Sequence, residues 1–129
     1  MADLTALLRR VYDTHDPDEG VKALLEISDP GIELWPAGLW LDDTGVVRGP
    51  DEVAAFFGRL QDAFEGYHFE PVRLEQRGET IAVAVRLEVR GRHSGLAESR
   101  SIGHLWRFRD GVAVEIRAYH TPEEAFEAL

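Results

Sequence analysis

The sequence predicts an α+β fold in which helices come first and an antiparallel sheet follows. Up to residue 64, apolar residues recur mainly with the period of a helix, and from Tyr67 onward they recur with the period of a strand. Asp110-Gly111 separates two alternating runs and predicts a tight β-hairpin. Because no linker or internal repeat divides the chain, residues 1–129 are expected to form one domain with its helices on one face of a sheet.

Three helices are predicted in the first half of the chain. The first is amphipathic and runs from Leu4 to Tyr12. Asp16-Pro17 provides the cap and first residue of the second helix, and Asp29-Pro30-Gly31 ends it. The third helix begins at Pro50-Asp51-Glu52 and carries an aromatic stripe that is typical of core packing, in which Phe56 is also a candidate to line a cavity: Val53, Phe56, Phe57, Leu60 and Phe64. A short helix is expected after Thr121-Pro122.

The strands are predicted from alternation. A short strand at residues 32–35 ends at Pro36, and the loop after it contains Trp40. The run at residues 67–76 contains Pro71, which indicates an edge strand or a bulge. In the hairpin, alternation puts Ile102, His104, Trp106 and Phe108 on one face, and it puts Val112, Val114, Ile116, Ala118 and His120 on one face of the second strand. If both faces point inward, two histidines project into an apolar, aromatic pocket.

Composition excludes several classes of function. The formal net charge of -10 disfavours nucleic acid and anionic membrane surfaces as partners. The absence of cysteine excludes disulfides, thiolate zinc sites and a cysteine nucleophile, and it fits a cytoplasmic protein. No signal peptide or apolar run of about 20 residues is visible. The histidines outside the hairpin are scattered without a His-Glu-x-x-His motif, so no metal site is expected.

Three strings give the chain a family resemblance. They are Val46 to Phe57 ("VVRGPDEVAAFF"), Arg77 to Gly95 ("RGETIAVAVRLEVRGRHSG") and His104 to Leu129 ("HLWRFRDGVAVEIRAYHTPEEAFEAL"). With the strand near Ile32, they resemble the ketosteroid isomerase-like, or nuclear-transport-factor-two-like, superfamily, and most closely its small SnoaL-like members, which include polyketide cyclases.

The resemblance implies a cone-shaped, strongly curved antiparallel sheet, with N-terminal helices closing an apolar cavity. It also implies a homodimer that pairs through the outer sheet face, although a solvated face is an open alternative. The residues expected on that outer face are Arg86, Glu88, Leu105, Arg107, Arg109, Glu115, Arg117 and Tyr119.

The sequence departs from the ketosteroid isomerases at the residues that carry their chemistry. Those enzymes place an aspartate base after the first strand, before a proline, and here Trp35 precedes Pro36. Their protonated acid on the penultimate strand corresponds to His104. Their tyrosine on the first helix has Tyr12 as its nearest match. The resemblance therefore supports the fold, whereas steroid isomerisation by that mechanism is not expected.

The candidate catalytic residues are His104, His120 and Glu33. Either histidine has the pKa range of a general base or donor near neutral pH, and Glu33 shares strand parity with Trp35 and is expected to face the cavity. For each, an ordinary structural role stays open: a histidine satisfied by hydrogen bonds, or a solvent-facing glutamate. Candidate substrate-binding residues, which equally suit core packing, are Tyr12, Trp35, Trp40, Phe56, Trp106, Phe108 and Ile116.

Two functions are carried forward from the sequence. The first is a small-molecule-binding SnoaL-like protein that acts without a cofactor on a hydrophobic cyclic substrate through His104, as a cyclase, isomerase or dehydratase. The second is a non-catalytic ligand-binding or dimerisation module of the same fold, which the missing aspartate base favours. An open pocket reached by His104 would favour the enzyme, and a cavity filled by tryptophan and phenylalanine would favour the module.

Overall fold

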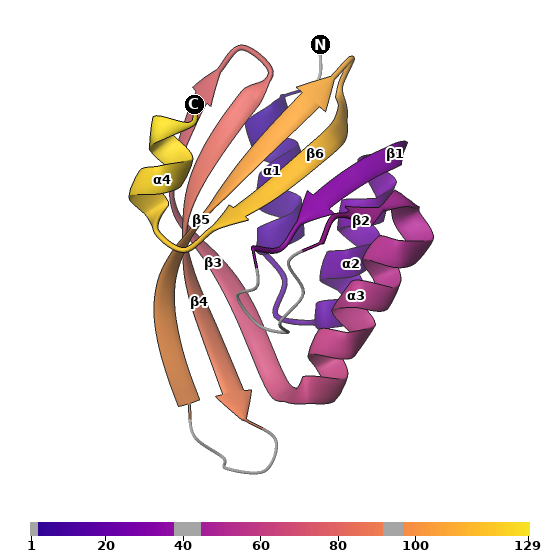
Figure 1. Ribbon diagram of the computed structural model, residues 1–129, viewed down its shortest axis with the longest axis vertical. Helices are drawn as coiled ribbons and strands as arrows, with labels where there is room; N and C mark the ends of the chain where they lie inside the picture. Colours follow the sequence, from indigo (N-terminus) through magenta and orange to yellow (C-terminus); the bar gives the residue numbers. More distant parts are fainter. Residues whose placement is uncertain (1–2, 38–44, 92–96) are drawn as a thin grey trace.

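The computed structural model describes residues 3–37, 45–91 and 97–129, and it confirms the α+β prediction (Figure 1). Helices α1 (Leu4–Tyr12), α2 (Pro17–Glu26) and α3 (Gly49–Ala63) cover one face of a curved, open sheet, and α4 (Pro122–Glu127) lies on the other. The strands are β1 (Ser28–Trp35), β2 (Val47–Arg48), β3 (Phe64–Arg77), β4 (Thr80–Gly91), β5 (Ala97–Arg109) and β6 (Val112–Tyr119).

The sheet has the strand order β2-β1-β6-β5-β4-β3. Neighbouring strands are antiparallel, as expected, except that β1 runs parallel to β6. Parallel pairing requires a long connection, and α3 together with β3, β4 and β5 provides it. The sheet is therefore mixed rather than wholly antiparallel.

The predicted caps and turn form as the residue types require. An Asp16 side-chain oxygen accepts a hydrogen bond from the backbone N–H of Asp18 at 3.0 Å, which caps α2 before its first-turn proline. Asp110 and Gly111 have φ of 52° and 84°. Two successive left-handed residues produce the type I′ twist that joins β5 tightly to β6. Thr121 accepts from the N–H of Glu124 at 3.3 Å and caps α4.

The prediction for Pro71 is confirmed on both counts. β3 is the edge strand of the sheet, and its pairing with β4 shifts between Pro71 and Arg73. Proline has no N–H to donate to a ladder, so an edge strand or a bulge is where it costs least.

The expected alternation along β6 is correct at Ile116 and wrong at Val112 and Val114. Ile116 is opposite Trp106, but the register then shifts, so that Phe108 is opposite Ala113. Ala113 is fully buried, whereas Val112 and Val114 are only half-buried. One extra residue in a strand reverses the facing of every residue beyond it, and the alternating valines gave no sign of it.

Gly103 fixes how α4 and the site are arranged around β5. A Cβ at Gly103 would lie 2.7 Å from Ala125 Cβ and 2.8 Å from the Thr121 carbonyl oxygen. Only glycine therefore lets α4 approach the sheet so closely. His104, the next residue, points to the opposite face because side chains alternate along a strand, and that face is the one covered by α1.

Candidate functional site

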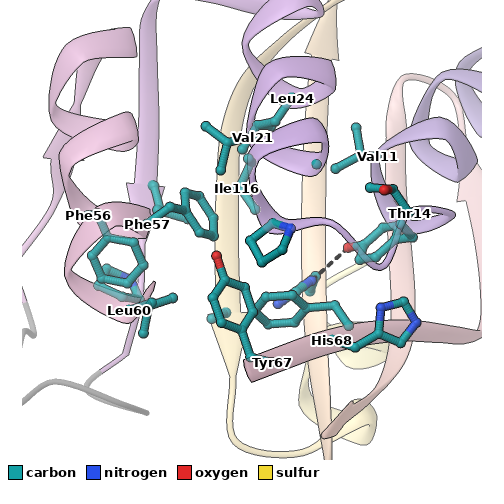
Figure 2. A pocket seen from close by; sticks show the side chains of 18 of the residues that line it. Val11, Thr14, Val21, Leu24, Phe56, Phe57, Leu60, Tyr67, His68 and Ile116 are labelled. Atoms are coloured by element: carbon teal, nitrogen blue, oxygen red, sulfur yellow. Dashed lines mark hydrogen bonds between the residues drawn. The ribbon is translucent and has the colours of Figure 1, made fainter. Parts of the chain in front are cut away.

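A pocket opens between the three covering helices and the inner face of the sheet, and Figure 2 shows it from close by. It holds about 870 Å³ of empty space, counting its open mouth. Most of its wall is apolar and comes from every covering helix and four strands: Val11, Val21, Leu24, Leu34, Phe56, Phe57, Leu60, Phe69, Trp106, Ile116 and Ala118. Against such a wall, the few polar groups determine what can be held in a fixed orientation.

A chain of three side chains joins α1 to β5 at the pocket. The indole Nε1 of Trp106 donates to the hydroxyl oxygen of Tyr12 at 2.9 Å. That hydroxyl lies 2.7 Å from Nδ1 of His104. Since the tyrosine oxygen already accepts from Trp106, its one hydrogen is best used as a donor to Nδ1. The neutral imidazole then carries its own proton on Nε2.

The Nε2 atom of His104 is available to the pocket. Nε2 has no hydrogen-bond partner among the described residues. Two side-chain atoms of these residues lack both a hydrogen bond and accessible surface, Trp35 Nε1 and Tyr67 Oη, and His104 Nε2 is not one of them. It therefore keeps accessible surface, and His104 lines the pocket. The arrangement offers one N–H donor to whatever occupies the space.

Burial keeps this chain uncharged near neutral pH. It lowers the pKa of His104 to about 4, because the imidazolium would lose its hydration with no carboxylate hydrogen-bonded to it among the described residues. Burial also raises the pKa of Tyr12, which the hydrogen bond from Trp106 offsets only in part. His104 is thus suited to donate a hydrogen bond and poorly suited to carry a positive charge.

Two further histidines lie side by side in the wall of the pocket. His15 follows α1 and His68 lies on β3, and their rings stack with centroids 3.9 Å apart. The pKa of His68 is lowered mainly by burial and then by His15, although Glu70 and Glu88 partly oppose this.

Tyr67 presents the remaining polar group of interest. Its side chain reaches from β3 between Leu60 and His68, with the hydroxyl directed towards Phe57 (Figure 2). The hydroxyl is buried and makes no well-formed hydrogen bond among the described residues. Gln61 lies near enough to lower the pKa of Tyr67 somewhat, but burial dominates and raises it. Such an unsatisfied buried hydroxyl is uncommon.

Five of the residues expected to bind substrate or act on it lie together in this pocket: Tyr12, Phe56, His104, Trp106 and Ile116. Trp40 lies outside the described residues. Tyr67, His15 and His68 also line the pocket and were not among the residues expected there. Tyr67 shares a face of the predicted strand with Phe69, and this alternation was the one sequence signal that could have placed Tyr67 at the pocket. Nothing local predicts that His15 stacks on a residue of the edge strand.

The expectation that Glu33 and Trp35 face the cavity is wrong. Leu34, between them, lines the pocket and pairs with Ile116, so its two neighbours point to the outer face. There a Glu33 oxygen binds Arg48 Nε at 3.0 Å. The Trp35 ring lies under the Arg117 guanidinium, whose carbon is 4.4 Å from the ring centroid.

His120 and Phe108 do not line the pocket either. His120 is exposed beyond the end of β6, with its Nε2 3.1 Å from the Ala37 carbonyl oxygen. Phe108 is buried and stacks on Trp106 at a centroid distance of 6.1 Å, and it is not among the residues that line the pocket. Of the three candidate catalytic residues, only His104 therefore reaches the pocket.

The described residues contain no group of three or more His, Cys, Asp or Glu side chains placed to hold a metal ion. Within the same ranges no helix is long and apolar enough to cross a membrane.

The comparison with known families decides where the chain belongs. A model of the SnoaL-like domain matches residues 4–116. The chain is a member of the SnoaL-like family. Among curated protein sequences, none matches this SnoaL-like chain significantly.

Solved structures agree with the fold. An NTF2-like protein of unknown function from Burkholderia pseudomallei K96243 is 21% identical, with a TM-score of 0.80 over 98% of this chain and 97% of the other. TerC, co-crystallised with polyporic acid, is 19% identical, with a TM-score of 0.78 over 98% and 96%. A putative SnoaL-like polyketide cyclase from Jannaschia sp. CCS1 is 18% identical, with a TM-score of 0.77 over 90% and 83%. Identities this low support the fold alone.

Proposed function

We propose that this SnoaL-like protein binds a hydrophobic cyclic small molecule in the pocket, and that His104 Nε2 donates a hydrogen bond to a carbonyl oxygen of that molecule. The observation that carries the proposal is the Trp106–Tyr12–His104 chain, with distances of 2.9 and 2.7 Å, which leaves the Nε2 proton for the pocket. The apolar and aromatic wall supports a ring system as the body of the ligand. The co-crystallisation of TerC with polyporic acid and the description of the Jannaschia protein as a putative polyketide cyclase are consistent with a cyclic ligand.

Donation from a neutral imidazole suits reactions that pass through an enolate. As charge develops on the carbonyl oxygen, a fixed N–H in dry surroundings stabilises it more than it stabilises the ground state. A histidine kept neutral for this purpose is a known arrangement in isomerase chemistry. The reaction is accordingly an isomerisation, cyclisation or dehydration that needs no cofactor.

Ligand binding without turnover is the second candidate, and one observation favours it. Asp16 is the sole carboxylate among the described lining residues, and one of its oxygens already caps α2. The expected glutamate, Glu33, is paired with Arg48 on the outer face. A polarised carbonyl therefore has no carboxylate base dedicated to it among the described residues.

The test begins with binding. Thermal unfolding is followed with cyclic ketones, lactones, aromatic polyketides and polyporic acid as probes, using the unmodified chain, His104→Ala and His104→Asn. Carbonyl compounds should raise the Tm of the unmodified chain and lose about 2- to 10-fold in affinity in His104→Ala, the effect of one lost hydrogen bond. Glu33→Gln is the matched control and should bind as the unmodified chain does.

Two results would end the proposal. No stabilisation by any probe class would remove the binding function, and equal affinity in His104→Ala would remove the role of the imidazole. For any probe that is converted, turnover unchanged in His104→Ala separates catalysis from this residue and favours the second candidate.

We also propose that two copies pair through the outer sheet face. On that face Glu115 pairs with Arg107 at 3.0 Å and with Arg117 at 2.7 Å. Charges of both signs on one face can complement a second copy across a two-fold axis. Sedimentation equilibrium of the unmodified chain and of Glu115→Lys tests this. A monomer at micromolar concentration in the unmodified chain would refute it.

A further inference from the structure

We propose that Tyr67 is a second recognition residue of the pocket, whose hydroxyl binds an oxygen of the ligand at the end opposite the carbonyl held by His104. The inference rests on the proposed function and names its ligand class more closely. The preferred ligand is a cyclic ketone that carries a hydroxyl or second carbonyl across the ring system.

The first observation is that, in the absence of a ligand, the Tyr67 hydroxyl has no hydrogen-bond partner in the described part of the chain. Its hydroxyl is buried and unsatisfied among the described residues, in a side chain that lines the pocket. The side-chain amide of Gln61 donates to a carboxylate oxygen of Asp18 at 3.3 Å and also lowers the pKa of Tyr67, but it forms no hydrogen bond of good geometry with the Tyr67 hydroxyl. Leaving a buried donor unpaired is costly, so a structure that retains one has a free-energy gain available to any group that pairs with it.

The second observation is where Tyr67 lies relative to His104. The Phe69 ring contacts both of them, with its centroid 5.6 Å from the Tyr67 ring and 5.7 Å from the His104 ring. The Tyr67 hydroxyl is directed towards Phe57 on α3 (Figure 2), whereas His104 is hydrogen-bonded to Tyr12 on α1, so the two residues offer their polar atoms to different parts of the pocket. A flat ring system stacked on the Phe69 ring would extend towards Nε2 at one end and towards the Tyr67 hydroxyl at the other.

The two contacts differ in when they form. Nε2 of His104 already has accessible surface, whereas the Tyr67 hydroxyl is sealed in the empty pocket. Contact with the ligand therefore needs a small rearrangement of the tyrosine side chain, and the new hydrogen bond stabilises it. The carbonyl contact should accordingly contribute to binding of every ketone, and the Tyr67 contact only to ketones with a distal oxygen.

The experiment compares ligands and variants in one cycle. The probes are 1-tetralone and its 5-, 6- and 7-hydroxy derivatives, titrated by calorimetry at pH 6.5 into the unmodified chain and Tyr67→Phe. We expect at least one hydroxytetralone to bind the unmodified chain more tightly than 1-tetralone. Tyr67→Phe should remove about 2- to 10-fold of that preference and leave 1-tetralone binding unchanged.

The outcomes separate this inference from the function on which it rests. If 1-tetralone and all its derivatives fail to bind the unmodified chain, both are wrong for this ligand class. If they bind equally, or if the preference persists in Tyr67→Phe, the inference alone is overturned.

Stability without ligand gives an independent readout. Removing an unsatisfied hydroxyl should leave the Tm of Tyr67→Phe unchanged or higher. A lower Tm would mean that the hydroxyl has an internal partner, and that too would overturn the inference.

Discussion

The neutrality of His104 predicts how stability depends on pH. Its pKa is about 4 in the folded chain against an ordinary value of 6.5. Below 6.5 the unfolded chain binds a proton that the folded chain does not bind until about pH 4. The contribution of His104 therefore favours folding fully above 6.5 and is lost as the pH falls through this window. Between pH 7 and pH 5 the loss is about 2 kcal/mol, since one pKa unit corresponds to about 1.4 kcal/mol.

His104→Asn provides the matched comparison, because an amide does not titrate and its oxygen can still accept from Tyr12. Urea unfolding at pH 7 and pH 5 gives the free energy of unfolding of each protein. The carboxylates and the other histidines contribute equally to both, so the difference between the two pH dependences isolates His104. If both proteins lose the same free energy over this range, the imidazole is not held neutral by burial, and the tautomer deduced for the site has no basis.

Four substitutions test other parts of the account. Tyr12→Phe removes the oxygen shared by an indole and an imidazole, so it should lower the free energy of unfolding by about 1–3 kcal/mol in urea. Gly103→Ala should lower it by about 1–3 kcal/mol, because the new Cβ would lie 2.7 Å from Ala125 Cβ. Gly58→Ala, in α3 with nothing within 4 Å of its Cβ, should raise it by about 0.5–1 kcal/mol instead. Glu33→Gln breaks a surface ion pair and should change it by less than about 1 kcal/mol. A stable Gly103→Ala would contradict the close packing of α4.

The fold was predictable because its signals are local. Helix caps, the Asp-Gly turn and the proline of the edge strand each depend on residues within a few positions of one another, and each forms as its residue types require. The parallel pairing of β1 with β6 was not predictable from alternation, since it depends on where a distant strand completes the sheet. Alternation also failed where β6 contains its bulge, because a bulge leaves no mark in the pattern of valines.

The site was predictable to the extent that strand parity held. Parity placed His104 and Trp106 correctly on β5, and the heptad-like spacing of α1 brought Tyr12 over them. For β1, Glu33 and Trp35 were predicted to face inward, but it is Leu34, between them, that lines the pocket. A four-residue strand with apolar residues at alternate and adjacent positions supports either choice, so burial of the leucine decided the outcome.

The choice between catalysis and binding now turns on a proton acceptor. A neutral hydrogen-bond donor stabilises an enolate but removes no proton. Among the described lining residues the groups that can accept one are His15, His68 and Asp16. Because the pKa of His68 is lowered, a rate that depends on it would persist to a pH below the ordinary histidine range before falling. A pH–rate profile of any converted probe therefore tests His68 as the acceptor. If no probe is converted, the pocket is left as a binding site whose donor orients the ligand.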